Sequence, residues 1–463
     1  MRKYSPPPGW TVAAYRFALD PTRGQERNLL SHCGAARFAY NWGLSWVRAA
    51  WEQRAAEASY GIPEPELTPW RPWSLAALRK VWNRVKGDLA PWWGENSKEA
   101  YNTGLAGAAA AFDNYTASRN NSRPGRMMGK PRRKKKHSAA LSCRFTTGTI
   151  RLESDRKHVT LPRLGVIKTH ESTRKLARRV EAGTARVLSA TVSHRSGRWF
   201  VAFQVELHRD DPAPHRPDLV IGVDLGITHL AVLSEPVAGV SDEDGFIANP
   251  RHFDQARKRL RRACRRVSRR RGPDRRARQQ PSNRWRKANA HRNRLHHRVA
   301  NLRADGLHKL TTALAGHAGT VVVENLNVAG MLKNKRLARQ ISDAGWSTLR
   351  RLLDYKTTWR GSVLRVADRW FPSSKTCSAC GAVKTKLPLR VRVFRCNACG
   401  MVLDRDLNAA RNLAKLVAEL SESGTGVAGH PRPPGRNRRG ADPKTRPSLA
   451  GGYETSTPQR HGV

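Results

Sequence analysis

The chain is poor in acidic residues and has no long apolar run. Of its 463 residues, 36 are Asp or Glu against 86 Lys or Arg, which gives a formal net charge of +50 at pH 7. A charge of this size repels itself, so we expect a polyanionic partner. No run of about 18–20 apolar residues could span a bilayer, and the opening MRKYSPPPGW lacks the apolar stretch of a signal peptide. We therefore expect a cytoplasmic protein that binds nucleic acid and no membrane.

Cysteine is also scarce, with seven in the chain. Cys33, Cys143 and Cys264 are scattered, which gives no disulfide framework and suits a reducing compartment. The other four form two CxxC pairs separated by 15 residues, each pair followed by a glycine: Cys377, Cys380, Cys396 and Cys399. This spacing is typical of a zinc ribbon. Four thiolates fill a tetrahedral coordination sphere, so we predict one structural Zn²⁺ ion.

The segment Leu219–Leu233, LVIGVDLGITHLAVL, is a short apolar run that carries a single acid. Its strand-forming residues on both sides of Gly226–Thr228 predict a buried β-hairpin. Asp224 lies at its centre. Because a buried carboxylate without a partner is costly, an acid at such a position usually holds a cation.

Two later acids also stand beside predicted elements. Glu324 ends an apolar strand in Thr320–Asn327, and Asp406 starts a predicted helix in Leu403–Leu413. On that helix Asp406, Ala409 or Ala410, and Leu413 share one face. Three carboxylates on two strands and a late helix predict a phosphodiester-cleaving site with two Mg²⁺ or Mn²⁺ ions. Each acid taken alone could instead be a strand-end or cap residue.

The rest of the chain divides into strands and helices. Val12–Leu19 alternates as a strand does, residues 21–120 have helical periodicity, and strand patterns return between Leu141 and Leu207. This order predicts a small β-barrel with a helical domain inserted into it. From about Ser421 onward the composition predicts a disordered basic tail.

Two segments concentrate the positive charge. Residues 123–137 contain eight Lys or Arg and no acid, and residues 251–300 contain 20 Lys or Arg against two acids. The second segment predicts two helices broken at Gly272–Pro273. We expect both segments to contact phosphates, although each could be a solvated surface. The candidate contact residues are Arg132, Arg133, Lys134, Lys135, Arg257, Arg261, Arg265, Arg269, Arg286 and Lys287.

Several motifs in this order resemble the TnpB family of transposon-encoded, RNA-guided DNA nucleases, which are related to compact type V CRISPR effectors. They are GVDLGITHLAV, VVVENLNVAGM, and CSACG…FRCNACG running into DRDLNAARNL. The resemblance covers nearly the whole chain. It implies an α/β fold plus a β-barrel: an RNase H-like (RuvC) nuclease domain with an inserted zinc ribbon. A wedge-type barrel with an inserted helical recognition domain would precede it.

The resemblance also implies residue roles and partners. Asp224, Glu324 and Asp406 would be the catalytic acids, with Asp224 bridging two Mg²⁺ ions, and Asp406 rather than Asp404 matches the DxNAA pattern. Guide RNA and target DNA would be the partners; the oligomeric state stays open. The expected domains are residues 1–20 (first barrel strand), 21–137 (helical domain and basic linker), 138–210 (rest of the barrel), 218–376 (nuclease, with a basic insert at 251–310), 377–400 (zinc ribbon), 401–420 (last nuclease helix) and 421–463 (tail).

Three other readings remain open at this stage. VDLGIT also resembles the phosphate loop of actin-like and sugar-kinase ATPases, a class that needs neither the four cysteines nor the excess of basic residues. A nucleic-acid-binding transposase accessory protein without catalysis would leave the three acids unexplained. A miniature type V CRISPR effector would share every motif above, and we favour the transposon nuclease because the chain is short.

Overall fold

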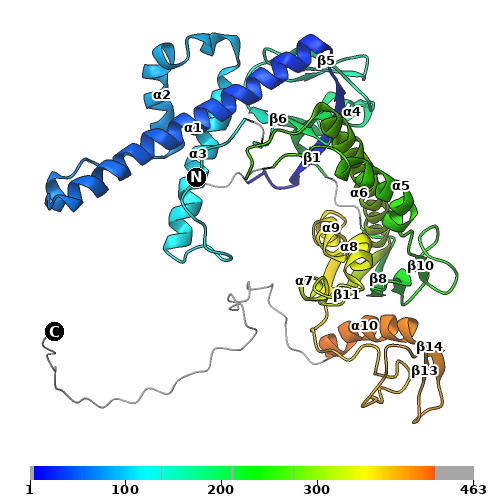
Figure 1. Cartoon of the computed structure of the whole chain (residues 1–463). Helices are drawn as coiled ribbons and strands as arrows, with labels where there is room; N and C mark the ends of the chain where they lie inside the picture. Colours follow the sequence, from blue (N-terminus) through cyan, green and yellow to red (C-terminus); the bar gives the residue numbers. More distant parts are fainter. Residues whose placement is uncertain (1–4, 137, 210–212, 275, 423–463) are drawn as a thin grey trace, which may run out of the picture.

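The computed structural model describes residues 5–136, 138–209, 213–274 and 276–422. The predicted disordered tail lies outside these residues from position 423 onward. Two sheets, each with its own helices, and a small four-cysteine unit follow one another along the chain (Figure 1). None of the described helices combines the length and apolarity needed to cross a membrane.

The first sheet has seven antiparallel strands in the order β2-β6-β7-β1-β5-β4-β3. Their bounds are β1 Trp10–Asp20, β2 Ser142–Phe145, β3 Arg151–Leu152, β4 His158–Leu161, β5 Gly165–Thr169, β6 Ala185–Arg195 and β7 Arg198–His208. The first strand of the chain lies in the middle, between β7 and β5. In the described part β2 and β3 are the two ends of this order, so the predicted closure into a barrel is not among the pairings.

Three helices separate β1 from β2 in the chain: α1 Arg23–Ser59, α2 Leu75–Leu89 and α3 Lys98–Arg119. Short 3₁₀ turns at Glu64–Glu66 and Pro91–Glu95 lie between them. Thr22 begins α1 with a capping box, and Ser74 and Ser97 cap α2 and α3. The helices share one apolar core with the first sheet. The insertion thus extends the core of the sheet.

The second sheet has five strands in the order β10-β9-β8-β11-β12. They are β8 Arg216–Asp224, β9 His229–Leu233, β10 Phe246–Ala248, β11 Ala318–Val323 and β12 Val363–Val366. β8 and β9 form the predicted hairpin, whereas β11 runs parallel to both β8 and β12. The helices of this part are α5 His252–Ser268, α6 Asn283–His317, α7 Val328–Met331, α8 Ala338–Ala344, α9 Trp346–Trp359 and α10 Arg405–Glu422.

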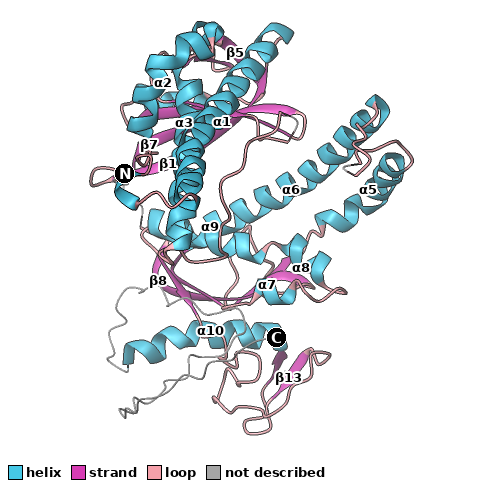
Figure 2. Ribbon diagram, turned by 60° about the vertical axis from the view of Figure 1, so that its left-hand side comes forward, coloured by secondary structure: helices cyan, strands magenta, loops and turns pink. Residues whose placement is uncertain are grey.

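Side chains alternate between the two faces of the central strands. Ile221 and Val223 of β8, with Val321 and Val323 of β11, belong to a core that also holds residues of α6 and α9. Val220 and Val322 belong to a second core with Leu413 of α10. Successive strand residues point to opposite faces, so even-numbered positions in these strands face α10. Figure 2 shows α10 across the sheet from α9.

Two short elements that lie between the predicted strands were not predicted from the sequence. α4, Arg174–Glu181, reads RKLARRVE and buries only Leu176 and Ala177, too little for an apolar period to be recognised. β5 was also missed; it starts at Gly165, whose φ of 71° marks a turn. In the segment 401–420, Val402–Asp404 form strand β14, paired with β13 (Val393–Arg395), and α10 begins at Arg405, one residue before the predicted start at Asp406.

Candidate active site and four-cysteine unit

Asp224 and Glu324 stand at matching positions of neighbouring parallel strands. Val223 lies opposite Val323 in the β8–β11 register, so each acid is the next residue along its strand. By the alternation described above, both even-numbered acids are directed to the α10 face. The two carboxylates are partly buried there.

Asp406 reaches the same face from the first turn of α10. Asp404 begins that helix: its Oδ1 accepts hydrogen bonds from the backbone N–H of Asp406 at 2.8 Å and of Leu407 at 3.1 Å. Asp404 is therefore an N-cap residue, whereas the Asp406 carboxylate does not cap the helix. An Arg392 nitrogen lies 3.5 Å from Asp406 Oδ2. Of the two acids in DRD, Asp404 is thus engaged in capping α10 and Asp406 in ion pairs with arginines.

The electrostatics of the three acids are coupled. Burial raises the pKa of Asp224 well above its ordinary value, and the nearby carboxylates of Glu324 and Asp406 raise it further. Burial also raises the pKa of Glu324, while a hydrogen bond from Ser373 opposes that shift. Acids that raise one another's pKa in this way have a natural partner in a cation. Their oxygens are nevertheless spread out: among the described residues, only the cysteines bring three or more ligand atoms within 4.8 Å of one another.

The four cysteines meet in one cluster, as their spacing predicts. Cys377 and Cys399 have their sulfurs 3.6 Å apart, and so do Cys380 and Cys396. A tetrahedral zinc with bonds of about 2.3 Å needs sulfurs about 3.8 Å apart, so the donor set fits this ion. The backbone N–H groups of Cys399 and Ala398 lower the pKa of Cys396 to about 6, which favours the thiolate that a metal binds.

Each CxxC pair is closed by a glycine in the left-handed region. Gly381 has a φ of 77° and Gly400 a φ of 74°, a conformation in which other residues are strained. Their backbone N–H groups donate to the carbonyl oxygens of Cys377 and Cys396 at 2.9 and 3.1 Å. The two turns thereby present two pairs of sulfurs to one point.

Side chains of α10 fasten the four-cysteine unit, here residues 372–404, to the second sheet. Asn408 donates to the Thr376 carbonyl at 2.7 Å and accepts from the Ser378 backbone at 2.9 Å. Asn412 donates to the carbonyls of Ser373 and Thr376, both at 2.7 Å. Both amides are buried. These residues were not predicted from the sequence. The available signal was the spacing of Asn408 and Asn412, which places them on one face of the helix.

A cavity of about 460 Å³ borders Glu324 on the α9 side of the sheet. Leu225, Trp346 and Val366 contribute apolar walls, and Arg350 and Arg351 contribute charge. Arg350 donates to the Asn325 side chain at 3.0 Å, next to Glu324 in the chain. This lining is complementary to the two parts of a nucleotide: the apolar walls suit the base, and the arginines suit the anionic phosphate.

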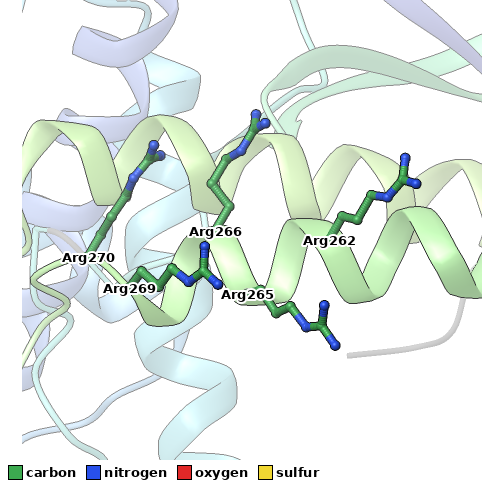
Figure 3. A pocket seen from close by; sticks show the side chains of 5 residues that line it. All are labelled: Arg262, Arg265, Arg266, Arg269 and Arg270. Atoms are coloured by element: carbon green, nitrogen blue, oxygen red, sulfur yellow. The ribbon is translucent and has the colours of Figure 1, made fainter.

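The basic helix α5 packs on α6 through Leu260, Ala263 and Val267 and exposes its arginines. Five arginines of α5 and the residues after it line a pocket of about 480 Å³ (Figure 3): Arg262, Arg265, Arg266, Arg269 and Arg270. None of the five forms an ion pair within the described residues. Arg265 and Arg269 were predicted from the sequence as phosphate contacts. Arg262, Arg266 and Arg270 were not predicted; the predicted arginines of this helix follow a single stripe at i, i+4 spacing.

The ten predicted phosphate contacts are all exposed. Those in the segment 132–135 lie against the helical insertion: Asn41 of α1 donates to the Lys134 carbonyl at 3.0 Å and accepts from its N–H at 2.8 Å. The Lys134 Nζ lies 3.9 Å from the centre of the Tyr40 ring, a cation–π contact. This basic segment is therefore fixed on α1.

Three family models match the chain. One described as "Probable transposase" matches residues 202–335, "Cas12f1-like, TNB domain" matches 346–413, and "Helix-turn-helix domain" matches 12–55. In the structure the last of these segments is β1 and the single helix α1. A solved structure described as "Cryo-EM structure of the Cas12f1-sgRNA-target DNA complex" has 12% identity and a TM-score of 0.46, covering 88% of this chain and 99% of that one.

Relatives from two bacteria match the chain over nearly their full length. "Putative RNA-guided DNA endonuclease Rv2885c" of Mycobacterium tuberculosis is 40% identical over 481 residues, which span 100% of this chain and 97% of that protein. "Putative RNA-guided DNA endonuclease InsQ" of Escherichia coli is 28% identical, over 87% of this chain and 91% of that protein. Identity of this extent, together with the transposase match across β8, β9 and β11, shows that the chain belongs to the TnpB family.

Proposed function

We propose that the chain is an RNA-guided DNA endonuclease that cleaves with Asp224, Glu324 and Asp406 in a RuvC-like nuclease domain. The observation that carries the proposal is the convergence of these acids, from β8, the end of β11 and the start of α10, on one face of the second sheet. The pKa of Asp224 is raised by both of the others. The naming of the full-length relatives as RNA-guided DNA endonucleases supports the same activity.

The three carboxylates would hold two Mg²⁺ or Mn²⁺ ions, since hard divalent cations take oxygen ligands. Such ions supply an activated water and stabilise the departing oxygen of a phosphodiester. What the chain itself contributes is placement. The β8–β11 register aligns Asp224 with Glu324, Ser373 holds Glu324, and the N-cap at Asp404 fixes the helix start that presents Asp406. The cavity with Arg350 and Arg351, which Glu324 also lines, would receive part of the DNA strand on the α9 side of the sheet.

Zinc would be held by Cys377, Cys380, Cys396 and Cys399 and would be structural, since the four thiolates leave no position for a substrate. The first sheet and its helical insertion would correspond to the wedge and recognition domains, which hold guide RNA and read a short motif beside the target. The exposed arginines of α5 would add contacts to phosphates that do not depend on sequence.

The test is cleavage by the full chain purified with its co-expressed guide RNA. We expect Mg²⁺-dependent cutting of a plasmid that carries the matching target, and loss of more than about a hundredfold in rate for D224A, because even outer residues around metal sites cost roughly 10–100-fold. D218N, an exposed acid on the same strand, is the matched control. Cleavage by D224A at the wild-type rate would refute the site, and binding without cleavage by the wild type would favour the accessory protein.

Sequencing of the co-purified RNA separates the two guided nucleases that share this fold. RNA from beside a transposon end supports the transposon nuclease, and a guide from a repeat array supports the CRISPR effector. ATP hydrolysis in the absence of nucleic acid would point to the ATPase class instead.

A further inference from the structure

Glu324 stands just beyond the last residue of β11, where the strand no longer holds the backbone. Within the described residues its carboxylate has one hydrogen-bond donor: the Ser373 hydroxyl, 2.8 Å from Oε1. Ser373 is only 3% exposed and lies in the segment between β12 and the first CxxC turn. The bond joins residues 49 positions apart. It leaves Oε2 without a donor and so open to other ligands.

Ser373 is itself held by α10. The Asn412 side chain donates to its carbonyl at 2.7 Å and to that of Thr376 at 2.7 Å. Asn408 hydrogen-bonds the residues on both sides of Cys377: it donates to the Thr376 carbonyl and accepts from the Ser378 N–H. Buried contacts thus run from α10, which also carries Asp406, through Ser373 to Glu324.

We propose that Ser373 is a positioning residue for Glu324 and is held in place by Asn412. Docking of the four-cysteine unit on α10 then also fixes the orientation of the Glu324 carboxylate. The inference rests on the nuclease function proposed above. A hydrogen bond to an ionised carboxylate is short and directional, and it selects one rotamer of a side chain that has three rotatable bonds. Outer residues of this kind orient the ligands of metal sites in general. A role in folding the four-cysteine unit alone would not require the Ser373 hydroxyl to face the acid.

The experiment compares S373A with wild type and with S342A, a serine exposed on α8, each as the full chain with its guide RNA. We expect S373A to raise the Mg²⁺ concentration for half-maximal cleavage, or to lower the rate, by roughly 10–100-fold. Target binding should stay unchanged, and zinc should stay at one ion per chain. Faster amide hydrogen exchange at residues 324–327 is the readout that does not depend on activity. S373T, which keeps the hydroxyl, should recover most of the rate.

The outcomes separate the two proposals. If D224A is inactive while S373A cleaves with the Mg²⁺ dependence of S342A, Ser373 does not position Glu324 and only this inference fails. If D224A cleaves normally, the proposed active site fails first. Loss of zinc in S373A would mean that Ser373 supports the zinc site instead of orienting Glu324, and would overturn the inference. Should S373A not fold, N412A takes its place, with the same expected rise in Mg²⁺ requirement and the same overturning results.

Discussion

Gly222 and Ala410 approach each other backbone to backbone: a Cβ at position 222 would lie 1.9 Å from the Ala410 carbonyl oxygen. No side chain is compatible with this distance. Gly222 lies two residues before Asp224 on the same face of β8, and Ala410 lies one helical turn after Asp406. The contact therefore sets how close the helix that carries one catalytic candidate comes to the strand that carries another.

Replacing Gly222 by alanine should separate α10 from β8. We expect destabilisation by about 1–3 kcal/mol, the usual cost of overpacking a filled site, and a further loss of cleavage because Asp406 moves away from Asp224. Thermal unfolding and cleavage rate would measure the two effects. G306A is the control: nothing lies within 4 Å of its Cβ, and alanine in the middle of α6 should stabilise by about 0.5–1 kcal/mol. Equal unfolding temperatures for G222A and wild type would contradict the packing.

The two acids of DRD should respond differently to substitution. D406N removes a carboxylate from the site and should abolish cleavage with little change in stability. D404N keeps the oxygen that caps α10 and should be close to wild type in both, whereas D404A loses the cap and should cost about 0.5–2 kcal/mol of stability. Cleavage assays and chemical denaturation of the three variants provide the comparison. If D404N folded normally but could not cleave, the carboxylate of Asp404 would be needed for catalysis, and the assignment to Asp406 alone would be wrong.

Local pattern was sufficient for much of the second sheet. The hairpin of β8 and β9 and the strand β11 before Glu324 form where the sequence predicts them, because apolar runs and flanking turn residues specify them locally. The cysteine cluster followed from spacing alone. For the three acids, chain order identified the candidates, but their common face follows only from the β8–β11 register, and their catalytic role stays a prediction.

What sequence reasoning missed lies in contacts between distant segments. Ser373 meets Glu324 across 49 positions, and Asn412 meets Ser373 across 39. No period or motif indicates such a pair, because the hydroxyl and the amide are common surface groups until the fold buries them. The positions of the unpredicted α4 and β5 are likewise determined by the sheet they join and not by their own pattern.

The arginine pocket on α5 should contribute measurably to the salt dependence of nucleic-acid binding. Each phosphate contact adds about 0.9 to the slope of log K against log salt for duplex DNA. R262Q and R266Q should therefore each reduce the slope by up to about one, at every DNA sequence. Binding titrations between low and moderate salt would test this. R48Q is the control, because Arg48 already pairs with Glu52 at 2.7 Å. If the slope were unchanged in all three variants, Arg262 and Arg266 would not contact phosphates.

We expect Lys356 to make the stability of the fold depend on pH. It is 7% exposed, and its Nζ donates to the His308 carbonyl and to the hydroxyls of Thr311 and Thr312 on α6. Burial, with a smaller effect of Arg360, lowers its pKa to about 8. In the unfolded chain a lysine titrates near 10.4. Between these values the unfolded state binds more protons, so the free energy of unfolding rises with pH there.

Compared with K356M, the wild type should therefore gain stability as the pH is raised from 8 towards 10, by up to about 1.4 kcal/mol per unit. Denaturant titrations at pH 7, 8, 9 and 10 would measure the difference between the two proteins. K309M replaces an exposed lysine of α6 that pairs with Asp305 at 2.7 Å and should show no such trend. A constant difference between wild type and K356M would mean that Lys356 keeps its ordinary pKa.

The position of α10 in the chain also has a consequence for synthesis. Asp224 and Glu324 precede the four-cysteine unit in the chain, but Asp406 follows it and belongs to the last described helix. A nascent or prematurely terminated chain that stops before residue 406 already carries the basic helices α5 and α6, yet it lacks one of the three acids. Under the proposed mechanism, cutting thus begins only after the cysteines have been translated and α10 has docked.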